Sequence, residues 1–238
     1  KILIVGDVML DKYYFGKVDR ISPEAPVPIV NIQKEESRLG GASNVANNIV
    51  SLGGHSLLCG VIGHDLFGKE IERISRHKNI DTFLLKTSSP TITKARIIGG
   101  KQQIVRVDYE DKSELNADNK KLFRDTISRI LPEYDILVIS DYGKGLISED
   151  LCRYLIKLAH KYDKKVIIDP KGKNWEKYSG ADIVTPNVKE LSDIVGYTVP
   201  NTDRAIEKAA REAITNNHLT ALLVTRSDKG MSLIGPIP

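Results

Sequence analysis

The chain has 238 residues and a formal net charge of +4, from 35 basic and 31 acidic side chains. This small excess, without a long basic tract, argues against nucleic-acid binding and is compatible with an anionic substrate. The sequence has neither a signal peptide nor an apolar run of membrane-spanning length, so we expect a cytoplasmic protein without membrane contact. Cys59 and Cys152 lie in apolar segments, which predicts buried thiols rather than a disulfide.

The first half of the chain alternates between strand and helix patterns. Residues 1–10 and 57–63 are apolar runs typical of strands that are buried on both faces. Residues 43–52 and 67–77 have the periodicity of amphipathic helices. This alternation indicates an α/β domain.

Two segments interrupt the alternation. Residues 12–38 contain three closely spaced prolines, which exclude a helix interior and allow either an edge strand or a half-exposed strand. Residues 91–98 and 101–109 flank Gly99 and Gly100, a pattern typical of a β-hairpin. We therefore interpret about 12–38 and 90–109 as one small β lid on the main domain.

After residue 110 the alternation is regular. The predicted elements are a helix over 117–131, a strand over 136–140, a helix over 149–162, strands over 165–168 and 182–185, helices over 188–195 and 203–217, and a strand over 221–225. Such an order predicts a doubly wound, mostly parallel sheet with right-handed crossovers. We assign the whole chain, residues 1–238, to this one α/β domain with its lid.

Several apolar runs end at a residue that can bind a ligand. These residues are Asp7, Asp141, Asp169, Asn187 and Arg226. In an open parallel sheet the ligand lies beyond the carboxyl ends of the strands. The repetition therefore suggests one shared site at this edge of the sheet.

Residues 40–44 (Gly-Gly-Ala-Ser-Asn) precede a predicted helix. Paired glycines let a ligand approach the backbone, the helix N-terminus offers free amides, and Asn44 can bind hydroxyl groups. Without further context, these residues slightly favour an ordinary capping loop. The wider spacing is more specific, because Gly53 follows Ala46 after six residues and Gly63 follows Gly53 after nine.

This spacing resembles the first signature of the ribokinase-like (PfkB) carbohydrate kinases. Further segments resemble one branch of that family, the D-glycero-β-D-manno-heptose-7-phosphate kinases. They are GDVMLD at 6–11, RISPEAPVP at 20–28, PTITK at 90–94, QQIVRVD at 102–108 and DPKG at 169–172. The resemblance covers the chain from end to end and implies a ribokinase-like fold.

The resemblance also implies roles for individual residues. The residues expected to bind the sugar phosphate are Asp11, Gly40, Gly41, Asn44, Arg106, Asp141, Lys144 and Lys171, with Arg20 and Lys94 as weaker candidates. Asp11 would orient the sugar hydroxyls, and the cationic side chains would bind the phosphate. An isolated Lys or Arg is more often a solvated surface charge, so the phosphate assignment depends on clustering.

The nucleotide is expected to bind to residues of two other segments. They are Asn187, Lys189, Glu190, Thr225, Arg226 and Gly230. ATP and Mg²⁺ are the implied cofactors, with Glu190 holding the metal through water. Asn187 and Glu190 also have the spacing of a capping box, and the two interpretations are compatible.

Two other motifs are incomplete. Residues 63–70 (GHDLFGKE) approach a Walker A phosphate loop, but Glu70 stands where a Ser or Thr hydroxyl should bind Mg²⁺. Residues 143–148 (GKGLIS) approach a dinucleotide fingerprint, but Ser148 replaces its third glycine. Neither a P-loop enzyme nor a Rossmann oxidoreductase is therefore favoured.

The implied reaction is ATP-dependent phosphorylation of heptose 7-phosphate at the anomeric hydroxyl, in ADP-heptose biosynthesis for the lipopolysaccharide core. The family's catalytic base is the aspartate of a Gly-Ala-Gly-Asp motif, which this chain lacks. We therefore expect the base beyond Pro238 and regard the kinase domain as C-terminally incomplete. Another sugar kinase of the family and a non-catalytic sugar- or nucleotide-binding protein remain as alternatives.

Lid sheets in the family often pair between subunits, so we also expect a homodimer. The apolar residues expected on the dimer face are Tyr13, Tyr14, Phe15, Ile29, Ile97 and Ile104.

Overall fold

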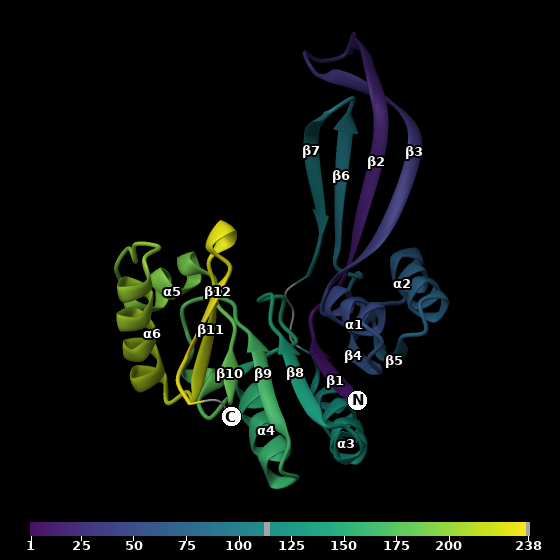
Figure 1. Cartoon of the computed structure of the whole chain (residues 1–238). Coiled ribbons are helices and arrows are strands. Elements are labelled where there is room, and N and C mark those ends of the chain that lie inside the picture. Colours follow the sequence, from purple (N-terminus) through teal and green to yellow (C-terminus); the bar gives the residue numbers. More distant parts are fainter. Residues whose placement is uncertain (112–114, 237–238) are drawn as a thin grey trace.

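The computed structural model describes residues 1–111 and 115–236, and its strands form two separate sheets (Figure 1). The main sheet contains β1 (Ile2–Gly6), β4 (Ser56–Gly63), β5 (Asp81–Thr87), β8 (Ile136–Ser140), β9 (Lys165–Asp169), β10 (Ile183–Val184), β11 (Ala221–Thr225) and β12 (Met231–Ile234). The lid sheet contains β2 (Val8–Ile21), β3 (Pro28–Gly41), β6 (Thr93–Gly99) and β7 (Gln102–Tyr109). The helices are α1 (Ala42–Ser51), α2 (Leu66–His77), α3 (Ala117–Ile130), α4 (Glu149–Lys161), α5 (Val188–Val195) and α6 (Asp203–Asn217).

The main sheet has the order β12-β11-β10-β9-β8-β1-β4-β5. All neighbouring strands are parallel except β11 and β12. The chain starts at β1, moves to β4 and β5 on one side, and then returns to β8 on the other side. This reversal confirms the predicted mostly parallel, doubly wound α/β fold and places the topological switch point between β1 and β8.

The helices cover both faces of the main sheet. In β1, Leu3 and Val5 pack in one buried cluster with Phe123 of α3, whereas Ile4 packs in a second cluster with Ile71 of α2. Successive side chains of a strand point to opposite faces, so the apolar run of β1 supplies both cores. The ends of the strands are consequently held rigidly at the edge where the site is expected.

The prediction of a single strand over residues 1–10 is wrong, because β1 ends at Gly6 and β2 begins at Val8. Asp7 lies between them, and its carboxylate accepts hydrogen bonds from the backbone N–H groups of Tyr142 (2.8 Å) and Lys144 (3.1 Å). These bonds hold the end of β1 beside the loop after β8 while the chain leaves for the lid. The apolar pattern continues past Asp7 because Val8 and its neighbours are buried at the base of the lid.

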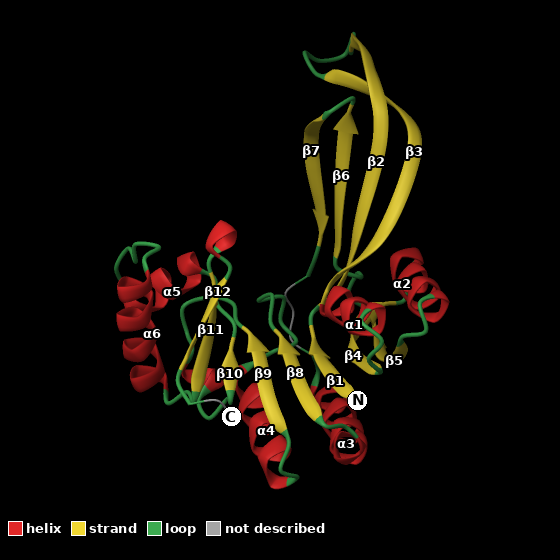
Figure 2. Cartoon of the chain, viewed as in Figure 1, coloured by secondary structure: helices red, strands yellow, loops and turns green. Residues whose placement is uncertain are grey.

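The lid rises from the end of the main sheet where the strand arrowheads lie, and it consists of strands and loops (Figure 2). Its order is β3-β2-β6-β7, with β2 antiparallel to β3 and parallel to β6. The hairpin of β6 and β7 turns at Gly100, which has a φ of 62°. β3 is an edge strand with Pro28 as its first residue, which agrees with the first of the two predicted alternatives. The lid strands extend beyond the predicted bounds of 12–38, from Val8 to Gly41.

The apolar residues predicted to form one lid face lie on two faces. Tyr13 and Phe15 stack on each other with ring centroids 6.1 Å apart. Tyr14 points to the opposite face, where it lies in register with Ile97, which in turn pairs with Val105. The expectation that Tyr13, Tyr14 and Phe15 share one surface is therefore wrong, since a strand alternates its side chains.

Within residues 1–111 and 115–236, no helix has the length and apolar character that a membrane span requires.

Candidate active site

The first cleft lies between the base of the lid and the start of α1, and it has a volume of about 570 Å³. Four predicted sugar-binding residues line it, namely Asp11, Gly40, Gly41 and Asn44. They come from β2, from the end of β3 and from the first turn of α1. The structure therefore brings the lid carboxylate and the glycine-rich helix start together, as the sequence predicted.

The carboxylate of Asp11 requires a glycine opposite it. Its Oδ1 accepts a hydrogen bond from Nη1 of Arg96 at 2.7 Å, and a Cβ atom on Gly40 would lie only 2.5 Å from Oδ2. Gly41 has a φ of 55°, and a Cβ there would lie 2.4 Å from the carbonyl oxygen of Asp7. The two glycines therefore make room for Asp11 and for the sharp turn into α1.

The first cleft is rich in positive charge. Among the described residues that line it, Arg38, Lys78, Lys94 and Arg96 are cationic and Asp11 is acidic. The guanidinium groups of Arg38 and Arg96 lie 4.8 and 5.2 Å from the ring centre of Tyr13. Cation–π contacts of this kind hold long side chains in place. The cleft can therefore bind an anion together with hydroxyl groups.

Sequence reasoning missed most of these cations. Lys94 was a weaker candidate, whereas Arg38, Lys78 and Arg96 were not proposed. Arg96 follows Lys94 by two positions on β6, so both side chains point to the same face of the lid. That spacing was the one signal in the sequence that could have identified Arg96.

The second cleft, of about 310 Å³, lies beyond the carboxyl ends of β8, β9 and β11. Its lining includes Asp141, Tyr142, Asp169, Lys171, Asn187, Glu190 and Thr225. Tyr142 also lines the first cleft, and the Lys94 amine lies 5.7 Å from its ring centre. The two clefts therefore meet at Tyr142, close to the switch point of the sheet.

Asn187 and Glu190 form a complete capping box at the start of α5. The Asn187 side chain accepts from the Glu190 N–H at 2.9 Å, and Oε2 of Glu190 accepts from the Asn187 N–H at 3.1 Å. The other oxygen, Oε1, pairs with the amine of Lys171 at 3.3 Å. The capping interpretation is confirmed, and both Glu190 and its partner Lys171 line the second cleft.

Asp169 is a site residue that the sequence suggested only as a strand end. Burial, and next the negative charge of Glu190, raise the pKa of its carboxyl to about 6. Oxygen donors of Asp169 and Glu190 fit a divalent cation, although the described residues contain no group of three such side chains around one point. Mg²⁺ tolerates this arrangement, because it keeps several waters and takes phosphate oxygens as ligands.

The raised pKa of Asp169 predicts that Asp169→Asn stabilises the protein at pH 7. A carboxyl with a folded pKa of about 6 and an ordinary value of 3.8 binds its proton more tightly in the folded state, so its contribution to stability falls as pH rises between these values. We expect a rise in Tm of roughly 2–6 °C at pH 7, measured by calorimetry. The gain should disappear near pH 4, and a lower Tm at both pH values would contradict this account.

Two predicted phosphate ligands do not line either cleft. Arg106 on β7 makes two hydrogen bonds to the carboxylate of Asp108, at 2.8 and 3.0 Å. The amine of Lys144 pairs with Glu110, and Lys144 lines a separate cavity together with Asp7. Arg106 reaches an acid two positions along its own strand, whereas Lys144 reaches one 34 positions away.

Two predicted nucleotide ligands are also paired elsewhere. Arg226 is only 6% exposed, and its guanidinium binds Asn201, Asp203 and Ser232 at 2.7–2.9 Å. These bonds tie the loop after β11 to the start of α6.

Lys189 lies on the exposed side of α5, and its amine pairs with the carboxylate of Asp193, one helical turn further along, at 3.1 Å. Gly230, with a φ of 74°, closes the turn before β12.

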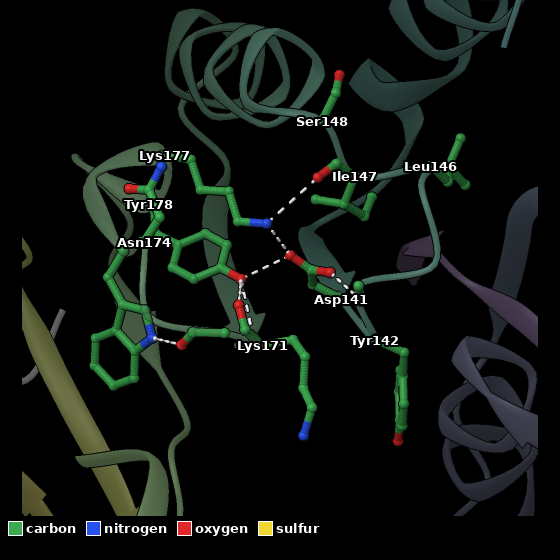
Figure 3. A network of polar contacts seen from close by, with 12 residues as sticks. Asp141, Tyr142, Leu146, Ile147, Ser148, Lys171, Asn174, Lys177 and Tyr178 are labelled. Atoms are coloured by element: carbon green, nitrogen blue, oxygen red, sulfur yellow. Dashed lines mark hydrogen bonds and ion pairs between the residues drawn. The ribbon is translucent and has the colours of Figure 1, made fainter. Parts of the chain in front are cut away.

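The carboxylate of Asp141 is used within the protein. In Figure 3 it points toward Lys177 and Tyr178, away from Tyr142. It pairs with the amine of Lys177 and accepts from the Tyr178 hydroxyl at 2.7 Å and from the Gly143 N–H at 2.8 Å. The Tyr178 hydroxyl also accepts from the N–H of Lys171 at 3.0 Å. Asp141 therefore anchors the loops that carry Tyr142 and Lys171, and both its oxygens are occupied.

Comparison with known proteins agrees with this architecture. Residues 1–235 match the pfkB family carbohydrate kinases. The chain is 45% identical over 237 residues to the bifunctional protein HldE of Haemophilus influenzae (strain PittEE), covering 99% of this chain and 48% of that protein. It is 44% identical over 234 residues to a D-beta-D-heptose 7-phosphate kinase of Bordetella bronchiseptica, covering 98% of this chain and 73% of that protein. The chain thus spans about half the length of the bifunctional relatives it matches.

The fold also resembles solved structures. The tetrameric inhibited form of phosphofructokinase-2 from Escherichia coli superposes with a TM-score of 0.79 at 20% identity, covering 100% of this chain and 77% of that one. This likeness confirms the expected ribokinase-like fold. The family match over almost all of its residues shows that the chain belongs to the pfkB family of carbohydrate kinases.

Proposed function

We propose that the protein transfers the terminal phosphoryl group of ATP to the anomeric hydroxyl of D-glycero-β-D-manno-heptose 7-phosphate, giving the 1,7-bisphosphate. The observation that carries the proposal is the meeting of two clefts at Tyr142, one with an acid among cations and one with Asp169 at the end of β9 and Glu190 at the start of α5. The name of the Bordetella bronchiseptica relative, a D-beta-D-heptose 7-phosphate kinase at 44% identity, supports the choice of sugar. The reaction would supply ADP-heptose synthesis for the lipopolysaccharide core, in the cytoplasm.

On the sugar side, Asp11 and Asn44 would hold hydroxyl groups while Arg38, Lys94 and Arg96 bind the 7-phosphate. A carboxylate accepts two hydroxyl hydrogen bonds, and guanidinium groups match the geometry of a phosphate dianion. Gly40 keeps the space in front of Asp11 open. This division assigns the hydroxyl groups and the phosphate of one substrate to different parts of the same cleft.

On the nucleotide side, the start of α5 and the end of β11 would hold the triphosphate. Mg²⁺, held by Glu190 and Asp169 largely through water, would neutralise phosphate charge. Asn187, Thr225 and Lys171 line the same cleft and can contact phosphate oxygens. Phosphoryl transfer needs mainly positioning and charge neutralisation, which this set of residues can provide.

We also propose that two copies pair through the outer face of the lid, defined by Tyr14, Ile97, Val105 and Val107. Val105 and Val107 are 45% and 38% exposed, although they are apolar. Covering this face would remove apolar area from water and stiffen the lid, which excludes water from the reacting groups. Solution scattering of the full-length protein that shows only monomer would contradict this pairing.

The substrate is tested by a kinetic panel on the full-length protein with heptose 7-phosphate, fructose 6-phosphate and ribose. We expect kcat/KM for heptose 7-phosphate to exceed that for the other two sugars at least about tenfold, because the phosphate and the hydroxyl groups are both recognised. Preference for another sugar would leave a kinase with a different substrate. Binding without turnover of any of them would favour a non-catalytic sugar-binding protein.

A further inference from the structure

The segment that approached a phosphate loop in the sequence has another role. Its Asp65 caps α2, and Oδ1 accepts the Gly68 N–H and the Thr91 hydroxyl, both at 2.7 Å. Oδ2 accepts the Thr91 N–H, also at 2.7 Å. A carboxylate thus fills the helix N-terminus at which a phosphate would bind in a true phosphate loop. The segment binds the chain that leads into the lid instead of a nucleotide.

Both the backbone N–H group and the hydroxyl group of Thr91 are hydrogen-bonded. Thr91 is only 1% exposed, and its hydroxyl accepts the Gly63 N–H at 2.8 Å while donating to Asp65. A Cβ atom on Gly63 would lie 2.6 Å from the carbonyl oxygen of Ser89, and one on Gly68 would lie 2.6 Å from that of Gly63. We call Gly63, Asp65, Gly68 and Thr91 the Asp65–Thr91 clamp.

The clamp holds the point at which β6 enters the lid. Immediately after Thr91, the carbonyl oxygen of Ile92 accepts the Leu10 N–H at 2.9 Å, and β6 then pairs with β2 from Thr93 onward. In this register Lys94 lies beside Asp11, and Arg96 reaches the Asp11 carboxylate at 2.7 Å. The position of the clamp therefore determines where Lys94 and Arg96 lie in the first cleft.

The same turn of α2 contacts the lid at a second place. The ring of Phe67 lies 5.4 Å from that of Tyr109 on β7 and 5.8 Å from the amine of Lys12 on β2. The start of α2 is thus connected to three of the lid strands. The nucleotide cleft, in contrast, is built from the ends of β8, β9 and β11 and from α5, which the clamp does not contact.

We propose that Asp65 and Thr91 are positioning residues for sugar-phosphate recognition, because their clamp fixes β6 so that Lys94 and Arg96 face the cleft. Neither residue lines the cleft or is placed to touch the substrate. The proposal rests on the proposed function only in taking the ligand of the first cleft to be a sugar phosphate. Loss of the clamp should therefore weaken sugar-phosphate binding and spare nucleotide binding.

The test compares Thr91→Val with Thr91→Ser in the full-length protein. Valine keeps the shape of threonine but removes the hydroxyl, so both the Asp65 carboxylate and the Gly63 N–H lose a partner, whereas serine keeps it. We expect Thr91→Val to raise KM for heptose 7-phosphate roughly tenfold while KM for ATP stays within about twofold of the wild type. Thr91→Ser should have the same KM values for both substrates as the wild type.

A second variant separates the clamp from the helix cap. Asp65→Ser retains an oxygen that can accept the Gly68 N–H, because serine is a good N-cap, but it is too short to reach Thr91. We expect the same rise in KM for the sugar phosphate as in Thr91→Val. Amide hydrogen exchange in Thr93–Gly99 should become faster in both variants, with exchange in β8 and β9 unchanged.

Two results would overturn the proposal. One is an unchanged KM for heptose 7-phosphate in both variants, and the other is a parallel rise in both KM values with a lower Tm, which would indicate general destabilisation. Failure of the proposed function would appear separately, as a wild-type protein that does not phosphorylate heptose 7-phosphate. Hydrogen exchange then decides on the clamp, because unchanged exchange in Thr93–Gly99 would refute it.

Discussion

Replacing Asp11 with alanine is expected to raise the dissociation constant of heptose 7-phosphate roughly a hundredfold or more, because the two charge-assisted hydrogen bonds that we propose between Asp11 and sugar hydroxyls would be lost. The dissociation constant of ATP should stay the same, since the nucleotide cleft lies on the far side of Tyr142. Titration calorimetry with each ligand separately measures both values. No turnover is required, so the result reports on binding alone.

The matched control is Asp108→Ala. Asp108 is also a carboxylate on the lid, and it pairs with an arginine as Asp11 does, but it does not line the cleft. We expect this variant to bind heptose 7-phosphate like the wild type. Equal losses of affinity for heptose 7-phosphate in the two variants would mean that any negative charge on the lid affects binding. Unchanged affinity in Asp11→Ala would show that Asp11 is not part of the site.

Arg96→Met is expected to weaken binding of heptose 7-phosphate by about tenfold to a hundredfold, and to weaken binding of the unphosphorylated heptose much less. The reason is that Arg96 lines the cleft with a guanidinium group held by Asp11 and Tyr13. Methionine keeps most of the side-chain length while removing the charge. The ratio of the two affinities therefore isolates the contribution of the phosphate contact.

Arg106→Met is the matched control for this experiment. Arg106 lies directly across from Arg96 in the lid register but is bound to Asp108 outside the cleft. The sequence resemblance predicted Arg106 as a phosphate ligand, whereas the structure favours Arg96. A large loss of affinity in Arg106→Met with little change in Arg96→Met would reverse this assignment.

The elements that could be predicted from sequence are those with a strong local signal. Strands buried on both faces, such as β1 and β8, appear as continuous apolar runs, and the helices appear by their periodicity. β5 and β12 were not predicted, because they lie at the two edges of the main sheet and are partly exposed. The break at Asp7 was missed because apolar residues on both sides of it are buried, although in different sheets.

The same division holds for the site. Gly40, Gly41 and Asn44 are close in sequence, and their motif predicted a ligand-binding helix start that does line the first cleft. Asn187 and Glu190 likewise act through neighbours three residues apart. Most assignments that differ from the structure concern long cationic side chains, whose direction depends on the acidic partner that each reaches. That partner is close along the chain for Arg106 and distant for Lys144. Arg226 is the clearest case, because its partners on α6 and β12 turn it into the protein interior.

The amino-acid sequence by itself determined most of the strands and helices and the glycines at the start of α1, because each depends on residues that are near neighbours along the chain. The family resemblance added the acid on β2 that lines the first cleft. Only the tertiary structure decided which cations join that acid. Arg96 lies 85 positions from Asp11, and their contact depends on the register of β6 against β2. That register is held by hydrogen bonds between Asp65 and Thr91, a contact between distant segments that no local pattern encodes.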